Sequence, residues 1–158
     1  MSITIENLFI GSDHAGYSLK NQLISFLKDN YNLNVNDVGC YSDSPVDYPN
    51  IANIVSEGVI AYNENFDHFA EKTIGILICG TGQGMSIAAN RHDYIRAGIA
   101  WNDEIAKMMR EHNSANVLCL PARYLSFEET KKIVHTFLTT PFTNEERHMR
   151  RIFSLDRT

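Results

Sequence analysis

The sequence contains no apolar run of about 18 residues, and its N-terminus has no basic region followed by an apolar core. Neither a membrane span nor a cleaved signal peptide is therefore expected. Basic residues are outnumbered, with 14 Lys and Arg against 19 Asp and Glu, for a formal net charge of −5. This balance argues against a general nucleic-acid binder, because such proteins carry a basic patch or stripe.

Cysteine is scarce as well. The three cysteines stand at positions 40, 79 and 119, an odd and scattered set that forms neither a disulfide framework nor a metal-binding motif. A reducing cytoplasm is the expected compartment. The remaining composition, with 44% hydrophobic and 21% charged residues, is ordinary for a soluble globular protein. The length of 158 residues predicts one domain, 1–158, with room for a core.

Strand-like and helix-like patterns alternate along the chain. The expected strands cover residues 8–11, 33–38, 73–79, 95–100 and 115–120, and the expected helices cover 17–27, 51–62, 84–91, 103–111, 127–138 and 144–155. Residues 39–49 are expected to form a loop, and the polar segment 63–72 a solvated loop or a short helix extension. Five strands, each followed by a helix, predict an α/β protein. The expected architecture is a single Rossmann-like three-layer αβα sandwich with a five-stranded parallel sheet and a C-terminal helix.

The most informative segment is 74–91. Its apolar, β-branched strand ends in Cys79, and Gly80, Gly82 and Gly84 then alternate with other residues before an Ala-rich helix. Glycines let backbone N–H groups turn toward a ligand at a helix N-terminus, so this pattern predicts an anion-binding loop. Ligands of such sheets bind beyond the carboxyl ends of the strands. We therefore expect the site to be formed by residues 11–14, 39–48, 79–84, 101–102 and 120–123.

Cys79 and the glycine loop each have two interpretations. A free cysteine is usually a core residue, which suits Cys119. Cys79 directly precedes the glycine loop, where positive potential favours a thiolate, so we interpret it as a catalytic base or nucleophile. The loop could instead bind a dinucleotide, but Met85 stands where the third glycine of G-x-G-x-x-G belongs. The loop also follows the third strand and not the first, and it lacks a P-loop lysine.

Polar pairs at two further places are candidates for the same site. Asp13 and His14 follow the first strand. Asp13 can cap the helix that begins near Ala15, whereas His14 has no capping role there. His112 and Asn113 end a helix, a position that favours a cationic His for structural reasons alone. Both pairs therefore have a structural and a functional interpretation.

Arg147 and Arg151 are four positions apart and share one face of the expected helix 144–155. They form either a solvated face paired with Glu145 and Glu146 or a phosphate grip based on bidentate hydrogen bonds. The segment 47–49, Asp-Tyr-Pro, can be interpreted as a simple turn, because proline restricts the backbone conformation of the residue before it.

Together these residues resemble the B-type ribose-5-phosphate isomerases and the related galactose-6-phosphate isomerase subunits. The resemblance runs nearly end to end, and its long central motif is highly specific. It rests on Gly-Ser-Asp-His-Ala-Gly (11–16), Asp-Tyr-Pro (47–49), Gly-Ile-Leu-Ile-Cys-Gly-Thr-Gly-x-Gly-Met-Ser-Ile-Ala-Ala-Asn (75–90), Ile-Arg-Ala (95–97), Glu-His-Asn-x-x-Asn-Val-Leu (111–118) and Arg-His-x-x-Arg (147–151).

The resemblance implies reversible isomerisation of ribose 5-phosphate and ribulose 5-phosphate through an enediolate, without metal or organic cofactor, as in the non-oxidative branch of the pentose phosphate pathway. It implies that Cys79 carries the proton between C2 and C1, that the 80–86 loop holds the enediolate oxygen through its N–H groups, and that His112 opens the furanose ring. The implied assisting and binding residues are Asp13 and Thr81 at the ring, and His14, Tyr48, Gly80, Gly82, Gly84, Ser86, Asn113, Arg123, Arg147 and Arg151 around the sugar and its phosphate.

The resemblance also implies a homodimer or homotetramer whose active sites combine residues of two subunits, with a small sugar phosphate as ligand and neither nucleic acid nor membrane as partner. Two features depart from the family. Trp101 stands where a smaller or polar residue is more common, which predicts a narrower pocket or a subunit contact, and segment 63–72 is longer than usual. Two other functions stay open: isomerisation of a six-carbon aldose phosphate such as allose or galactose 6-phosphate, and non-catalytic sensing of a sugar phosphate.

Overall fold

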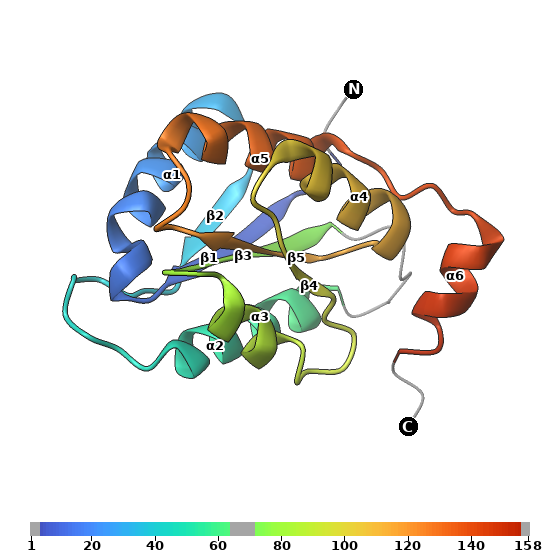
Figure 1. Cartoon of the computed structure of the whole chain (residues 1–158), viewed down its shortest axis with the longest axis horizontal. Helices are drawn as coiled ribbons and strands as arrows, with labels where there is room; N and C mark the ends of the chain where they lie inside the picture. Colours follow the sequence, from blue (N-terminus) through green and yellow to red (C-terminus); the bar gives the residue numbers. More distant parts are fainter. Residues whose placement is uncertain (1–3, 64–71, 156–158) are drawn as a thin grey trace.

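The computed structural model describes residues 4–63 and 72–155. In this part of the chain a five-stranded parallel sheet lies between two layers of helices (Figure 1). The strands are β1 (Asn7–Ser12), β2 (Asn34–Asp37), β3 (Thr73–Cys79), β4 (Ala97–Ile99) and β5 (Val117–Pro121), in the spatial order β2-β1-β3-β5-β4. The helices are η1 (His14–Gly16), α1 (Tyr17–Asn30), α2 (Tyr48–Tyr62), α3 (Gln83–Ala89), α4 (Asp103–Asn113), α5 (Phe127–Thr139) and α6 (Glu146–Ile152). The expected fold class is confirmed.

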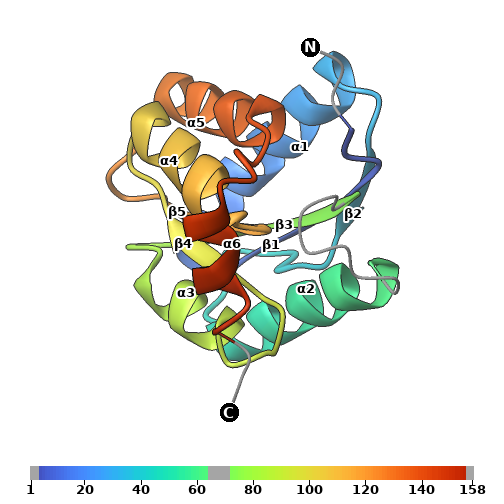
Figure 2. The same cartoon turned by 90° about the vertical axis from the view of Figure 1, so that its right-hand side faces the viewer.

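Each face of the sheet has its own hydrophobic core. Helices α1, α4 and α5 cover one face and α2 and α3 cover the other (Figure 2). All residues of β3 and β5 are buried, because successive side chains of a strand point to opposite faces and both faces are covered. Thus Ile76 and Ile78 pack in the first core, and Leu77 and Cys79 in the second.

Local signals explain both ends of α4 and the start of α5. Ser126 and Glu129 form a capping box at the start of α5, in which each side chain bonds the other residue's backbone N–H. Asn102 caps α4 by accepting a hydrogen bond from the Ile105 N–H at 2.8 Å. Helix α4 ends at Asn113, because the following Ser114 has a φ of 45° in the left-handed region.

Several expected boundaries differ from the observed ones by one to three residues, and three of these differences have a clear local cause. Helix α2 begins at Tyr48 and not at residue 51, because Pro49 fits the first helical turn, where its missing N–H costs nothing. Strand β4 begins at Ala97, since the Arg96 N–H bonds the Asn116 side chain at 2.8 Å. The last helix begins at Glu146, because Asn144 has a φ of 55° that no right-handed helix allows.

The expectation for segment 63–72 falls mainly outside the described residues. Within the described ranges, no helix combines the length and the apolar character that crossing a bilayer requires.

Candidate active site

A pocket of about 210 Å³ opens at the carboxyl edge of the sheet, where the sequence places the site. It is formed by the ends of β1, β3 and β5 together with the first turns of α2 and α3. Its lining residues are Asp13, His14, Ala15, Tyr48, Cys79, Gly80, Thr81, Gly84 and Arg123. Eight of these nine are residues that the sequence singled out.

The Cys79 sulfur lies where β3 passes into the glycine loop, and the residue is 5% exposed. It accepts a hydrogen bond from the Gly82 N–H at 3.1 Å. Gly82 has a φ of 75°, a conformation that glycine adopts without a steric penalty and that turns its N–H back toward the sulfur. A backbone N–H at the start of a helix favours negative charge on that sulfur.

Tyr48 packs against the first turn of α3. A Cβ atom placed on Gly84 would lie 2.8 Å from the Tyr48 Cζ atom, which is closer than atoms approach without overlap. Glycine at this position therefore lets the phenol ring lie directly over the loop. This contact brings the α2 side of the pocket to within van der Waals distance of the loop that follows Cys79.

Arg123 brings a positive charge to the same edge. The backbone N–H of Arg123 donates to the Gly80 carbonyl at 3.1 Å, and the backbone N–H of Ala122 donates to the Cys79 carbonyl at 2.9 Å. A Cβ on Gly80 would lie 3.2 Å from the Arg123 Nε atom. These bonds fix the turn after β5 to the end of β3, and Arg123 in this turn lines the pocket.

Asp13 has the capping role that the sequence allows. Its carboxylate accepts a hydrogen bond from the Gly16 N–H at 3.1 Å and caps the short helix η1, while its own N–H donates to the Ile78 carbonyl at 3.0 Å. The neighbouring His14 is exposed and lines the pocket. The chain therefore turns at the end of β1 in a way that keeps both side chains at the carboxyl edge.

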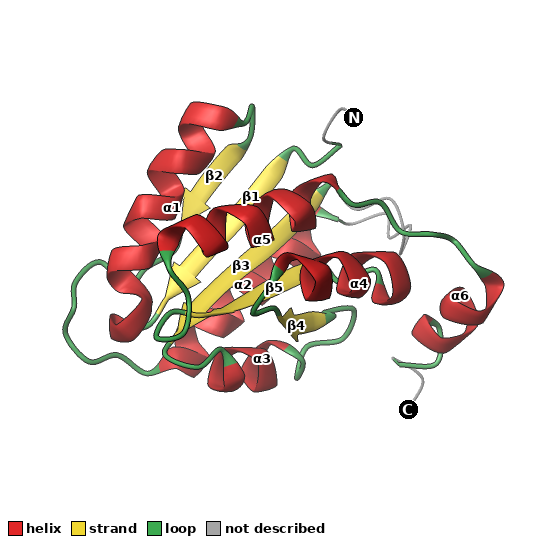
Figure 3. Ribbon diagram, turned by 45° about the horizontal axis from the view of Figure 1, so that its top comes forward, coloured by secondary structure: helices red, strands yellow, loops and turns green. Residues whose placement is uncertain are grey.

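Four predicted site residues lie elsewhere. A helix that connects two parallel strands runs back along the sheet, so α4 ends at the amino edge with His112 and Asn113. Helix α6, which carries Arg147 and Arg151, lies beyond that same end (Figure 3). None of the four lines the pocket around Cys79.

Contacts hold α6 against the end of α4. The His112 and His148 rings stack with centroids 4.6 Å apart, and the Thr143 hydroxyl donates to the Glu111 carbonyl at 2.8 Å. Burial, followed by the charges of Arg147 and His112, lowers the pKa of His148. Arg147 also donates to a Glu145 carboxylate oxygen at 2.7 Å, as the structural interpretation of the cluster predicts.

Ser86, Cys119 and Trp101 also lie outside the lining. The Ser86 hydroxyl donates to the Ala97 carbonyl at 3.4 Å, so it faces β4. Cys119 is fully buried, and burial together with the charge of the nearby Cys79 raises the pKa of its thiol. Trp101 is 58% exposed and does not line the pocket, so the expectation that it narrows this pocket is not met on a single chain.

Comparison with known proteins identifies the chain's relatives. The family model described as Ribose/Galactose Isomerase matches residues 8–155. The chain belongs to the Ribose/Galactose Isomerase family. A probable ribose-5-phosphate isomerase B of Mycoplasma genitalium is 42% identical over 147 residues, covering 92% of this chain and 91% of that protein.

Two solved structures of similar proteins extend the likeness to the fold. Ribose 5-phosphate isomerase B from Anaplasma phagocytophilum superposes with a TM-score of 0.86 and 39% identity, covering 98% of this chain and 99% of that one. Ribose-5-phosphate isomerase B from Mycoplasma genitalium with bound ribulose-5-phosphate gives a TM-score of 0.85 and 41% identity, covering 96% and 94%.

In this member of the Ribose/Galactose Isomerase family, the pocket offers a thiol, a loop of backbone N–H groups and a guanidinium within one small volume. Such a set suits proton transfer next to a developing oxyanion. Among residues 4–63 and 72–155 there is no cluster of three or more His, Cys, Asp or Glu side chains that could hold a metal ion. Ala15 is the lining residue that sequence reasoning missed; its position inside the 11–16 motif was the available signal.

Proposed function

We propose that this chain interconverts ribose 5-phosphate and ribulose 5-phosphate. The observation that carries the proposal is the Cys79 sulfur at the end of β3, held 3.1 Å from the Gly82 nitrogen and bordering the pocket. The names of the similar proteins, one of them with ribulose-5-phosphate bound, support this substrate.

In the proposed reaction the Cys79 thiolate removes the proton from C2 of the open-chain aldose. The electron pair of that C–H bond forms the C1–C2 double bond, and the carbonyl electrons move to the oxygen on C1, which gives an enediolate. Thiol protonation of C1 and transfer of the O2 proton to O1 then complete the ketose. The pocket-lining Gly80 and Gly84, at the N-terminus of α3, supply a positive environment for the enediolate oxygen.

The ring-opening and phosphate-binding groups come, in this proposal, from a second copy of the chain. His112, Asn113, Arg147 and Arg151 are at the amino edge of the sheet, whereas Cys79 is at the carboxyl edge. One chain therefore carries both halves of the proposed site at opposite ends. A homodimer or homotetramer brings the amino-edge half of one copy to the pocket of another, so that His112 opens the furanose ring and the arginines bind the phosphate.

The proposal takes residues 1–158 as one domain and places the chain in the cytoplasm. Its three cysteines are free thiols, which is typical of a reducing compartment.

The decisive experiment is the variant Cys79→Ala, with Cys119→Ala as a control that removes a thiol from the neighbouring strand. We expect Cys79→Ala to lose isomerisation, measured by a coupled assay, and the uptake of solvent deuterium into the substrate at C2. It should still bind ribose 5-phosphate, because the other lining residues are unchanged. Wild-type activity in Cys79→Ala would overturn the proposal.

The same assay separates the alternatives. Comparing kcat/KM for ribose 5-phosphate with that for allose and galactose 6-phosphates tests the carbon number of the substrate. A wild-type protein that binds sugar phosphates without exchanging any deuterium would be a sensor and not an isomerase.

A further inference from the structure

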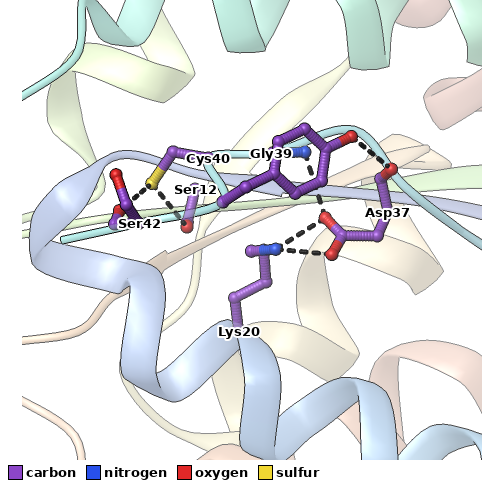
Figure 4. Close-up of polar contacts among 7 residues, drawn as sticks. Ser12, Lys20, Asp37, Gly39, Cys40 and Ser42 are labelled. Atoms are coloured by element: carbon purple, nitrogen blue, oxygen red, sulfur yellow. Dashed lines mark hydrogen bonds and ion pairs between the residues drawn. The ribbon is translucent and has the colours of Figure 1, made fainter. Parts of the chain in front are cut away.

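An ion pair between a buried lysine and a partly exposed carboxylate joins α1 to the end of β2 (Figure 4). The Lys20 ammonium is 2.6 Å and 2.7 Å from the two carboxylate oxygens of Asp37, and the Lys20 side chain is fully buried. Lysine is rarely buried, because removing its charge from water is costly unless a partner compensates. Its presence at a core position of α1 therefore calls for a specific role.

Hydrogen bonds connect this pair to the end of β1. The Asp37 carboxylate also accepts from the Gly39 N–H at 3.0 Å. The Gly39 carbonyl accepts from the Ser12 N–H at 2.7 Å, and the Ser12 carbonyl accepts from the Cys40 N–H at 2.8 Å. We call Ser12, Lys20, Asp37, Gly39 and Cys40 the β1-end network (Figure 4).

The β1-end network ends one residue before the pocket. Ser12 directly precedes Asp13 and His14, both of which line it. Its two backbone bonds to residues 39 and 40 hold one side of the turn, while the Asp13 N–H, bonded to the Ile78 carbonyl at 3.0 Å, holds the other. The direction in which Asp13 and His14 leave the strand is therefore fixed by the position of residues 37–40.

Two aromatic rings lie beside the Lys20 ammonium, whose side chain is fully buried. The Lys20 nitrogen lies 5.5 Å from the Tyr41 ring centroid and 5.9 Å from that of Tyr17, and the Tyr41 hydroxyl donates to the Asp37 carbonyl at 3.1 Å. In such surroundings the electrostatic attraction between the two charges is stronger than at an open surface, and rings near a cation add to it. The carboxylate is thus held in one orientation toward the Gly39 N–H.

We propose that Lys20 and Asp37 are positioning residues, whose ion pair fixes Asp13 and His14 in the sugar-phosphate pocket through the β1-end network. This inference rests on the proposed function for its ligand. It differs from a purely structural role, because the cost of burying the ammonium offsets much of the attraction to a partly exposed carboxylate, whereas apolar side chains in their place could not orient an N–H group.

Three variants separate positioning from stability. Lys20→Met removes the ammonium and leaves the Asp37 carboxylate, whose side chain is 31% exposed, without this cation. Lys20→Met with Asp37→Leu removes both charges, so neither is left without its partner, and it also removes the acceptor for the Gly39 N–H. Leu23→Ala is the matched control, because Leu23 is fully buried on the same helix and is not part of the network.

The kinetic readout is the split between KM and kcat for ribose 5-phosphate. We expect Lys20→Met and the double variant to raise KM by about tenfold or more, since misplacing a binding group by even about 1 Å is costly. Their kcat should change less, because Cys79 and its Gly82 donor lie on β3 and the loop after it. Leu23→Ala should lower the melting temperature and leave KM within about twofold of wild type, and Lys20→Arg should restore part of the affinity.

Hydrogen exchange tests the same inference without any activity. In the double variant, the amides of Ser12, Gly39 and Cys40 should exchange faster than in wild type, with the amides of β3 unchanged. Uniform acceleration across β1 and β3, or an unchanged KM in the double variant of an active enzyme, would overturn it. A wild-type protein without isomerase activity would instead overturn the proposed function, and the exchange pattern would still decide the inference.

Discussion

Gly84→Ala is a small change that we expect to lower activity strongly while leaving stability nearly unchanged. Gly84 lies in the first turn of α3, and an ideal Cβ there would sit 2.8, 2.9 and 3.1 Å from the Cζ, Cε2 and Cε1 atoms of the Tyr48 ring. Ordinary contact begins at 3.4 Å. The ring tip must therefore move by about 0.6 Å or more, away from the loop that borders Cys79.

The magnitudes follow from these distances. Alanine is better than glycine inside a helix by about 1 kcal/mol, and the Tyr48 side chain can yield because the residue is 39% exposed. The free energy of unfolding should thus stay within about 1 kcal/mol of wild type. A displaced pocket wall costs up to about a hundredfold in rate per ångström, so we expect kcat/KM to fall by about 10- to 100-fold, or about 1.4 to 2.7 kcal/mol of transition-state stabilisation.

The assay pairs thermal unfolding with the kinetics of ribose 5-phosphate isomerisation. Gly58→Ala is the control, because a Cβ there would lie 2.7 Å from the Phe9 ring, between α2 and β1 and outside the pocket. It should lose stability and keep wild-type kcat/KM. Full activity in Gly84→Ala, or an equal loss of activity in both variants, would refute the reasoning that the Tyr48 ring over the loop shapes the site.

Two further predictions concern titratable groups. Iodoacetamide should label Cys79 before Cys40, because the Cys40 thiol donates a hydrogen bond to a carbonyl at 3.1 Å. Cys119 is buried and its thiol pKa is raised, so it should be labelled only in urea. Equal labelling rates of all three cysteines in the native protein, measured by peptide mass spectrometry, would contradict this prediction. Burial lowers the pKa of His148 in the folded protein. As the pH falls below about 6.5, His148 is therefore protonated in the unfolded chain before it is protonated in the folded one. The folded state loses stability over this pH range, down to the lowered pKa of the folded protein. The urea midpoint of unfolding should therefore fall less between pH 7.5 and 5.5 in His148→Asn than in wild type. An equal fall in both proteins would show that His148 does not cause this pH dependence.

Most of the fold could be predicted from the sequence, because the apolar pattern carries it. The strand 73–79 is predicted with its observed bounds, since its apolar residues form a nearly continuous run that is buried on both faces of the sheet. The starts of α2, β4 and α6, which the sequence misplaces, depend instead on tertiary hydrogen bonds and on local backbone angles. The Arg96 N–H bonds a side chain twenty residues away, and the left-handed φ of Asn144 is not visible in a polar segment.

The composition of the site was easier to predict than its arrangement. The sequence motifs assign His112 and Arg147 to the same site as Cys79. Only the structure shows that α4 runs back along the sheet, so that His112 and Arg147 lie at the opposite end of the sheet from Cys79. Lys20 escaped notice for another reason. In an amphipathic helix a lysine beside Leu19 and Leu23 is read as a boundary residue, and nothing in the local sequence indicates that Asp37, seventeen residues later, pairs with it.

The separation of Cys79 from Arg147 within one chain has a consequence for how the protein must be assayed. Under the proposed assembly, each copy donates its amino-edge groups and receives those of another, which a closed two-fold arrangement satisfies for both copies at once. Each active site is then complete only while two chains are associated. Specific activity should be constant above the dissociation constant of the assembly and decline below it, so a rate measured at one enzyme concentration reports association as well as chemistry.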